Sequence, residues 1–398
     1  MEKITKLDNM GRGITYIDNK ITFIKNTLED EEVDIKITKS KSKYNEGEVT
    51  KYYKKSPYRI ESLCTYYDKC GGCSLLHTTY EHTIDYKKNK LKEILKKYAN
   101  LDIEINFINN PKPLNYRNKI SLKIHNNKIG YYEEKTHKII SIKSCLLAEE
   151  SINDFIKDIK YLNIINGNLT IRNNYNNELL IIIDTKDKLN IDIEYLKNKH
   201  KIAGIVVNNK TYYNDTFLIE NINNLLFKVS YDSFFQVNRI MCSKMFDLVK
   251  EEITNNDVVL DLYSGVGTLG INVAKLAKKV YGIEIVENAV INASYNTKIN
   301  KVDNAYYMLG DVGTTLSKIN DNIDIIIVDP PRAGLDNKTK QYIINSNSKK
   351  IIYVSCDPIT LARDIKDLST KYNVTKVTGL DLFSYTYHCE SITVLERR

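Results

Sequence analysis

The last third of the chain contains three apolar runs that each lead into a side chain capable of chemistry. These side chains are Cys356 after residues 351–355, Asp329 after 325–328 and Asp261 after 258–260. Runs of this kind are typical of buried strands. Parallel strands bring their carboxyl ends to one edge of a sheet, which is where open α/β sheets bind ligands. The sequence therefore predicts a crevice shared by one thiol and two carboxyl groups.

A glycine-rich turn follows Asp261. Its glycines, within 265–270, match the pattern G-x-G-x-x-G, which nicotinamide dehydrogenases also use, so the motif alone leaves that class open. Glu284 ends the next predicted strand, where an acid binds ribose hydroxyls in either class. Asp311 closes the strand after that and is placed for an adenine edge. A carboxylate at 261 would repel a pyrophosphate, and this argues against a dinucleotide.

The motif Asp329-Pro-Pro-Arg332 separates the two classes further. Prolines fix the backbone, so the aspartate side chain and carbonyl are aimed in one direction. Methyltransferases that act on nucleobases use such a tip, and dehydrogenases do not. The sequence favours a class I S-adenosylmethionine site, with acids at the ends of successive strands.

The cysteines indicate a second centre. There are seven, and an odd number argues for metal or catalytic use rather than a disulfide framework. Cys64, Cys70 and Cys73 lie within ten residues, and Cys145 is the candidate for a fourth ligand. Four cysteines suit either a structural zinc or a [4Fe-4S] cluster, and the spacing leaves both open, as well as no metal.

The other elements must position these groups, and a chain of 398 residues predicts two or three domains. Residues 1–56 alternate apolar and polar positions with interleaved lysines and tyrosines, typical of an OB-like RNA-binding barrel or of a solvated strand surface. Residues 57–225 predict an amphipathic helix over 80–98 and then a mainly antiparallel sheet. Arg117 and Lys119 at a strand start are candidates for phosphate contacts. Residues 226–398 repeat strand and helix, so the fold class is α/β with a doubly wound parallel sheet.

The composition bears on partners and location. The net charge of +8 and pI of about 8.8 favour a polyanion such as RNA. No apolar run approaches the roughly 18 residues needed to span a bilayer. The first residues lack the pattern of a signal peptide. We therefore expect a cytoplasmic protein without a membrane contact or an obligate protein partner.

Taken together, the motifs resemble those of the RNA uracil-5 methyltransferases. The matching segments are 261–268, 329–332, 355–358 with 361–364, 388–390 and 234–238. Residues 1–56 are similar to a TRAM domain, and the four cysteines resemble the [4Fe-4S] motif of the 23S rRNA subgroup. The resemblance covers essentially the whole chain in order and favours an iron–sulfur cluster over zinc.

This resemblance implies S-adenosylmethionine-dependent formation of 5-methyluridine, first in 23S rRNA and alternatively in tRNA. It implies that Cys356 is a nucleophile that adds to C6 of uracil and that Glu390 is the base that removes the C5 proton. The implied cofactor contacts are Gln236, Tyr263, Glu284 and Asp329. The other alternative is a non-catalytic RNA-binding or ribosome-assembly factor, against which the intact thiol and base argue.

Two positions depart from the family pattern. Asp357 stands where Asn is common, and a carboxylate beside the nucleophile is expected to raise the pKa of Cys356 unless it is hydrogen-bonded elsewhere. Ser264 stands where Cys is frequent, and we expect no effect of this change.

Overall fold

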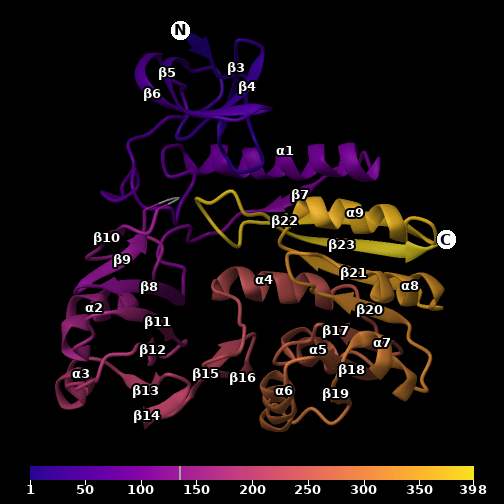
Figure 1. Ribbon diagram of the computed structural model, residues 1–398. Helices are drawn as coiled ribbons and strands as arrows, with labels where there is room; N and C mark the ends of the chain where they lie inside the picture. The colour runs from indigo at the N-terminus through magenta and orange to yellow at the C-terminus, as the bar shows by residue number, and fades with distance from the viewer. Residues whose placement is uncertain (134–135) are drawn as a thin grey trace.

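The computed structural model describes residues 1–133 and 136–398 and contains an N-terminal, a central and a C-terminal sheet (Figure 1). The N-terminal sheet has the strand order β1-β5-β6-β4-β3-β2. Its strands are β1 (Glu2–Lys3), β2 (Lys6–Leu7), β3 (Gly13–Ile17), β4 (Lys20–Ile24), β5 (Glu32–Ser40) and β6 (Tyr44–Lys54). Ile4, Ile24 and Val33 form its buried core. The alternation of apolar and polar residues predicted β3, β4 and β5, whereas β1, β2 and β6 were not predicted as separate strands.

The long helix α1 (Tyr80–Ala99) confirms the helix predicted over 80–98. The hydroxyl of Thr79 caps its first turn, and Asn100 ends it in the left-handed conformation. Its buried face, with Leu91 and Leu95, packs into the same core as helix α9 (Pro358–Leu368). Figure 1 shows α1 between the N-terminal sheet and α9. The helix predicted to lie in the central domain therefore covers the C-terminal sheet.

The central sheet has seven strands in the order β10-β9-β8-β11-β12-β13-β14. These are β8 (Lys119–His125), β9 (Lys128–Tyr132), β10 (Ile139–Ser141), β11 (Gly167–Asn173), β12 (Leu179–Asp184), β13 (Ile202–Val207) and β14 (Lys210–Asn214). The helices are α2 (Glu150–Asp158), η1 (Ile159–Leu162) and α3 (Ile193–Lys199). The sheet is mainly antiparallel, as predicted. Only the β12–β13 pair among its pairings is parallel, because α3 provides the crossover that a parallel pair requires.

The hairpin of β15 (Phe217–Ile222) and β16 (Leu225–Ser230) spans the position where we predict the domain boundary. Its buried side chains, among them Phe227 and Val229, pack with helix α4 (Arg239–Lys250) in the core of the C-terminal unit. By packing, the hairpin belongs with the last domain. The division at 56 and 225 remains a prediction.

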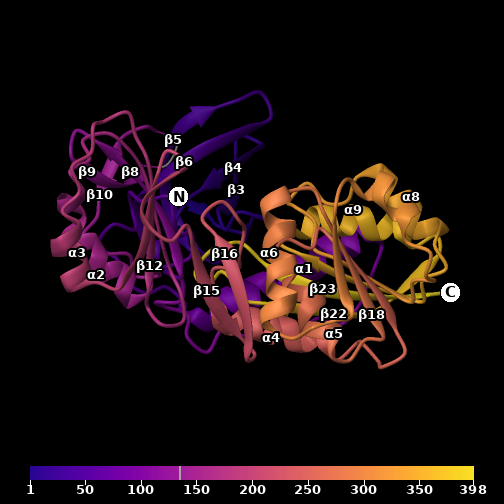
Figure 2. The same ribbon diagram turned by 90° about the horizontal axis from the view of Figure 1, so that it is seen from below.

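The C-terminal sheet has eight strands in the order β19-β18-β17-β20-β21-β23-β22-β7. These are β7 (Asn106–Ile108), β17 (Val258–Leu262), β18 (Lys279–Glu284), β19 (Ala305–Leu309), β20 (Ile325–Val328), β21 (Lys350–Ser355), β22 (Tyr372–Leu380) and β23 (Glu390–Arg397). The remaining helices are α5 (Thr268–Ala274), α6 (Glu287–Ile299), α7 (Val312–Thr315), η2 (Leu316–Lys318) and α8 (Asn337–Asn345). Figure 2 shows α8 and α9 on one face and α4 and α5 on the other, as in a doubly wound sheet. In the described ranges no helix combines the length and apolar character needed to cross a membrane.

Candidate active site

The strand ends that the sequence singled out lie next to one another. Strand β17 pairs in parallel with β20, and β20 pairs with β21. Asp329 follows β20 directly and Cys356 follows β21 directly. Strand β23 runs antiparallel to β21 with Ser355 opposite Ser391, so Glu390 begins β23 beside Cys356. One sheet edge therefore carries the thiol of Cys356 and the carboxyl groups of Asp329 and Glu390.

The environment of Cys356 keeps its thiol protonated. Burial is the largest effect and raises the pKa of Cys356 to about 11, with the charges of Glu390 and Asp329 acting in the same direction. The positive charge of Arg332 opposes them. A thiolate is therefore scarce at neutral pH, and substrate binding must change this balance.

The unusual Asp357 is hydrogen-bonded away from the thiol. Its Oδ1 accepts from the backbone N–H groups of Ile359 at 2.9 Å and Thr360 at 3.1 Å. It thus caps helix α9, and Pro358 is suited to the first helical position because it has no N–H to satisfy. Its charge is the last of the causes that raise the pKa of Cys356. We expected Asp357 to raise the pKa of Cys356 unless its carboxylate was hydrogen-bonded elsewhere, and these two hydrogen bonds meet that condition.

The two carboxyl groups in the crevice have raised pKa values. Glu390 is 2% exposed, and burial followed by the charge of Asp329 raises its pKa well above the ordinary range. Desolvation raises the pKa of Asp329 to about 7. Two neighbouring and largely desolvated carboxyl groups resist ionising together, so the pair holds a proton near neutral pH. Such a group is a strong base once it is ionised.

The raised thiol pKa predicts a steep pH dependence for alkylation of Cys356 in the RNA-free enzyme. The rate with iodoacetamide should rise about tenfold per pH unit from about pH 7 towards the pKa, because the thiolate is the nucleophile. Glu390→Gln should increase the rate at about pH 9, since it removes a negative charge. Peptide mass spectrometry identifies the modified residue. A rate that is already constant above about pH 8 would contradict the prediction.

The glycine turn is built around a tyrosine that the sequence did not single out. A Cβ at Gly267 would lie 2.8 Å from Cζ of Tyr307, and one at Gly282 would lie 2.2 Å from its Cδ1. The Tyr307 hydroxyl donates to the Gly267 carbonyl at 3.1 Å. Because Gly267 and Gly282 have no side chain, the Tyr307 ring fits beneath the turn. At these two positions glycine is therefore needed for packing. The G-x-G-x-x-G pattern alone gave no signal for this role.

Asp261 anchors the same turn from below. Its Oδ2 accepts from the Gly270 N–H at 2.9 Å, while Oδ1 is buried without a hydrogen-bond partner. Burial raises the pKa of Asp261 to about 8, and the charges of Asp329 and Glu284 add to the increase. The Ser264 hydroxyl is also buried and unpaired. The crevice therefore contains two buried polar atoms, Asp261 Oδ1 and Ser264 Oγ, whose hydrogen-bonding capacity is unused within the described residues.

The other predicted cofactor residues fall into two places. Glu284 ends β18, where its Oε2 accepts from the Gly265 N–H at 2.9 Å. Tyr263 follows β17 with a φ of 62° and donates from its hydroxyl to Asp336 at 3.1 Å. Gln236 lies in the segment between β16 and α4, where its backbone carbonyl accepts from the Asn118 side-chain amide at 3.1 Å. The sheet edge gathers Tyr263, Glu284 and Asp329, and the structure records no contact between Gln236 and them in its described part.

Asp311 lies just past the strand that we expected it to close. Strand β19 ends at Leu309, and the Asp311 carboxylate caps helix α7 by accepting from the Gly313 N–H at 2.9 Å.

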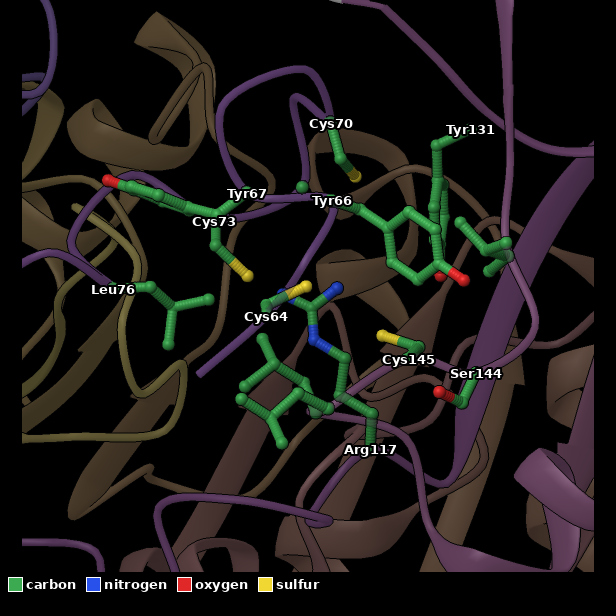
Figure 3. A pocket seen from close by; sticks show the side chains of 14 residues that line it. Cys64, Tyr66, Tyr67, Cys70, Cys73, Leu76, Arg117, Tyr131, Ser144 and Cys145 are labelled. Atoms are coloured by element: carbon green, nitrogen blue, oxygen red, sulfur yellow. The ribbon is translucent and has the colours of Figure 1, made fainter. Parts of the chain in front are cut away.

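The four cysteines of the second centre line one cavity. Figure 3 shows Cys64, Cys70, Cys73 and Cys145 around this space, with the guanidinium of Arg117 among them. Burial raises the thiol pKa values of Cys64, Cys70 and Cys73. No three His, Cys, Asp or Glu side chains within 1–133 and 136–398 are grouped so that they could hold a single metal ion.

Arg117 corrects one prediction. We named it as a candidate for phosphate contact, but its side chain lines the cysteine cavity, and its Nε is buried with no hydrogen-bond partner among the described residues. Its charge lowers the thiol pKa values of Cys70 and Cys73 against the larger effect of burial. This position could not be predicted from the sequence, because Arg117 is distant from three of the four cysteines along the chain.

Comparison with known proteins identifies the family. The sequence profile of a family described as tRNA (uracil-5-)-methyltransferase matches residues 79–309 and 313–398, and that of the TRAM domain matches residues 3–50. The chain belongs to the RNA uracil-5 methyltransferase family. The predicted enzyme class is confirmed: it is an S-adenosylmethionine-dependent RNA uracil-5 methyltransferase with a TRAM domain. The nicotinamide dehydrogenase alternative is excluded.

Relatives of this methyltransferase match it over nearly their whole length. A protein of Clostridium acetobutylicum described as an uncharacterized RNA methyltransferase is 33% identical over 99% of this chain and 96% of its own. One of Staphylococcus aureus with the same description is 30% identical over 98% and 96%. The crystal structure of the tRNA (uracil-54, C5)-methyltransferase of Pyrococcus abyssi in complex with S-adenosyl-L-homocysteine has a TM-score of 0.81, with 26% identity over 99% of this chain and 100% of that chain. The mixed α/β fold with an N-terminal TRAM sheet is confirmed.

Proposed function

We propose that this methyltransferase forms 5-methyluridine in 23S rRNA through a covalent adduct between Cys356 and C6 of the target uracil. The observation that carries the mechanism is the placement of Cys356 beside Glu390, at paired ends of β21 and β23. A thiol and a buried carboxyl group at adjoining positions supply the nucleophile and the base that this reaction needs.

The reaction divides one difficult step into two easier ones. C5 of uracil is a poor nucleophile until the Cys356 thiolate adds to C6 and makes C5 enolate-like. Bound S-adenosylmethionine supplies the methyl group. Glu390 then accepts the C5 proton, the C6–S bond breaks, and the thiolate is regenerated. The raised pKa of Glu390 suits this role, because a strong base is required.

Three further assignments concern the cofactor and the substrate. We assign Tyr263, Glu284 and Asp329 to the cofactor crevice, and Gln236 by its family motif. The unpaired buried atoms of Asp261 and Ser264 fit a crevice that a polar ligand completes. The target uridine must leave its stack to reach Cys356, which suits a loop better than a duplex. The TRAM unit would hold the flanking RNA.

We propose that Cys64, Cys70, Cys73 and Cys145 hold a [4Fe-4S] cluster. The residues fit this group: four thiols surround one cavity, and four cysteines are the ligand set that such a cluster requires. The positive charge of Arg117 among them offsets part of the negative charge of four thiolates. When bound, such a cluster would tie the segment 64–73 to the central sheet.

Anaerobically purified protein should therefore be brown, with broad absorbance near about 400 nm and about four iron atoms per chain. Cys70→Ser should lose the colour, because a ligand is gone. The matched control Cys242→Ala should keep it, since Cys242 is buried in α4 outside this cavity. A colourless protein that contains zinc would contradict the cluster.

The choice of 23S rRNA follows from the cysteine motif and the TRAM domain together. A specific observation favours tRNA as the second candidate: the structurally similar Pyrococcus abyssi enzyme is named for uracil 54 of tRNA. Mass spectrometry of separated 23S rRNA and tRNA, from cells with and without the chain, tests both. Loss of 5-methyluridine from 23S rRNA supports the proposal, and loss from tRNA transfers the same chemistry to the second candidate. If 5-methyluridine is lost from neither RNA, both candidate substrates are contradicted, and a non-catalytic RNA-binding role is favoured.

A further inference from the structure

The loop 381–389 between β22 and β23 leads directly into Glu390. Helix α1 holds this loop from one side. Lys87 and Asp381 form a buried ion pair at 2.6 Å, with side chains 0% and 1% exposed. Lys90 donates to the Tyr387 carbonyl at 2.8 Å and to the Asn9 carbonyl of the N-terminal sheet region at 2.7 Å. The loop is therefore fixed by groups from two other parts of the chain.

Residues 64–78, which include Cys64, Cys70 and Cys73, form the cysteine segment. This segment holds the loop from the other side, through Ser74, the residue after Cys73. The backbone N–H groups of Ser74 and Leu75 both donate to the Tyr385 carbonyl, at 3.2 and 3.1 Å. In return, the Tyr387 N–H donates to the Ser74 hydroxyl at 2.8 Å. These three hydrogen bonds form a clasp between segments more than 300 positions apart.

The clasped loop has a backbone that needs support. Tyr385 has a φ of 58°, a region that residues other than glycine seldom adopt, so its conformation persists only where the surroundings enforce it. The same loop carries His388, whose Nε2 lies 3.4 Å from the guanidinium of Arg332. Arg332 in turn belongs to the tip that contains Asp329. A shift of this loop would therefore move Glu390 and disturb the charge balance around Cys356.

Ser74 differs from the lysines of α1 in what supports it. Lys87 and Lys90 project from a long regular helix, whereas Ser74 lies in the segment 64–78, which contains no helix or strand. The order of that segment depends on turns and on the cavity that its cysteines line. Of the two sides that hold the loop, the cysteine segment is thus the one whose position is not fixed by a regular helix or strand.

We propose that Ser74 is a positioning residue: its hydroxyl and the adjoining backbone clasp loop 381–389 to the cysteine segment and so hold Glu390 in register with Cys356. This inference rests on the proposed roles of those two residues. It gives the cysteine centre a function in the reaction, because disorder at Cys73 is transmitted through Ser74 to the base.

The test compares Ser74→Ala with Ser74→Thr, which keeps a hydroxyl, and with Ser369→Ala, which also removes one hydroxyl hydrogen bond, at 2.7 Å to the Ile365 carbonyl, but at the C-terminal end of α9. Loss of one hydrogen bond is expected to lower kcat about tenfold in Ser74→Ala with KM for RNA within about twofold, because base placement and not binding is affected. The covalent RNA–protein complex should accumulate during turnover, since its breakdown needs Glu390. Ser74→Thr should restore most of the rate, and Ser369→Ala should match the parent.

A readout without RNA or cofactor completes the test. Hydrogen exchange measured by mass spectrometry should be faster at 381–389 in Ser74→Ala than in Ser369→Ala, with residues 258–270 unchanged. Parental exchange at 381–389, or a lower kcat without accumulated complex, would overturn the inference. The parent enzyme distinguishes failure of this inference from failure of the proposed mechanism. If the parent forms no Cys356-dependent complex with RNA, the mechanism itself fails, whatever Ser74→Ala does.

Discussion

Cys356→Ala should abolish 5-methyluridine formation while leaving RNA binding intact. The side chain supplies the bond to C6 that activates C5. The neighbouring Cys389, which directly precedes β23, is 0% exposed and so cannot take its place. We expect the single-turnover rate to fall by a factor on the order of 10⁴ or more. The variant loses one sulfur atom from a half-buried strand end, so its stability should change little.

The measurement is transfer of a labelled methyl group to RNA under single-turnover conditions, with a filter-binding titration of the same RNA in parallel. Cys242→Ala is the matched control, because it removes a thiol that is buried in the core of the same domain. Detectable turnover by Cys356→Ala would refute the covalent mechanism. Loss of RNA binding together with activity would show that the thiol is needed for the fold of the site instead.

Glu390→Gln should trap the enzyme on its RNA. The amide keeps the shape of the side chain but cannot accept the C5 proton, so the adduct forms and does not break down. Loss of a general base lowers turnover by about 10²- to 10⁴-fold. A covalent complex that requires S-adenosylmethionine and Cys356 should appear on a denaturing gel, and it should contain methylated uracil.

Glu396→Gln is the control for this variant, because it makes the same change at an exposed position of the same strand β23. It should turn over like the parent and accumulate no complex. If Glu390→Gln lost activity without a trapped complex, Glu390 would act before methyl transfer, for instance in forming the thiolate, and the base would have to be sought elsewhere in the crevice.

Local sequence patterns predicted most of the elements that carry the site. Strand β21 ends at Ser355 with Cys356 next, and β18 ends at Glu284, as the apolar runs predicted. Such predictions succeed because a buried strand needs a continuous apolar run whatever its neighbours are. The roles of Cys356 and Glu390, by contrast, came from family motifs and remain proposals. The sheet that α1 covers was not predicted, because periodicity shows that a helix has an apolar face but not which sheet it packs against.

The sequence by itself determined the α/β class, the acids and the thiol at successive strand ends, the four-cysteine motif and the family. The tertiary structure alone decided that Tyr307 fills the space beneath the glycine turn, that Arg117 lies in the cysteine cavity, and that Ser74 clasps the loop before Glu390. It also decided which carboxyl groups keep a proton, because burial and neighbouring charges set their pKa values. The physical reason is common to all of these: each depends on groups distant in the chain that meet only when the elements pack, and no local periodicity records that meeting.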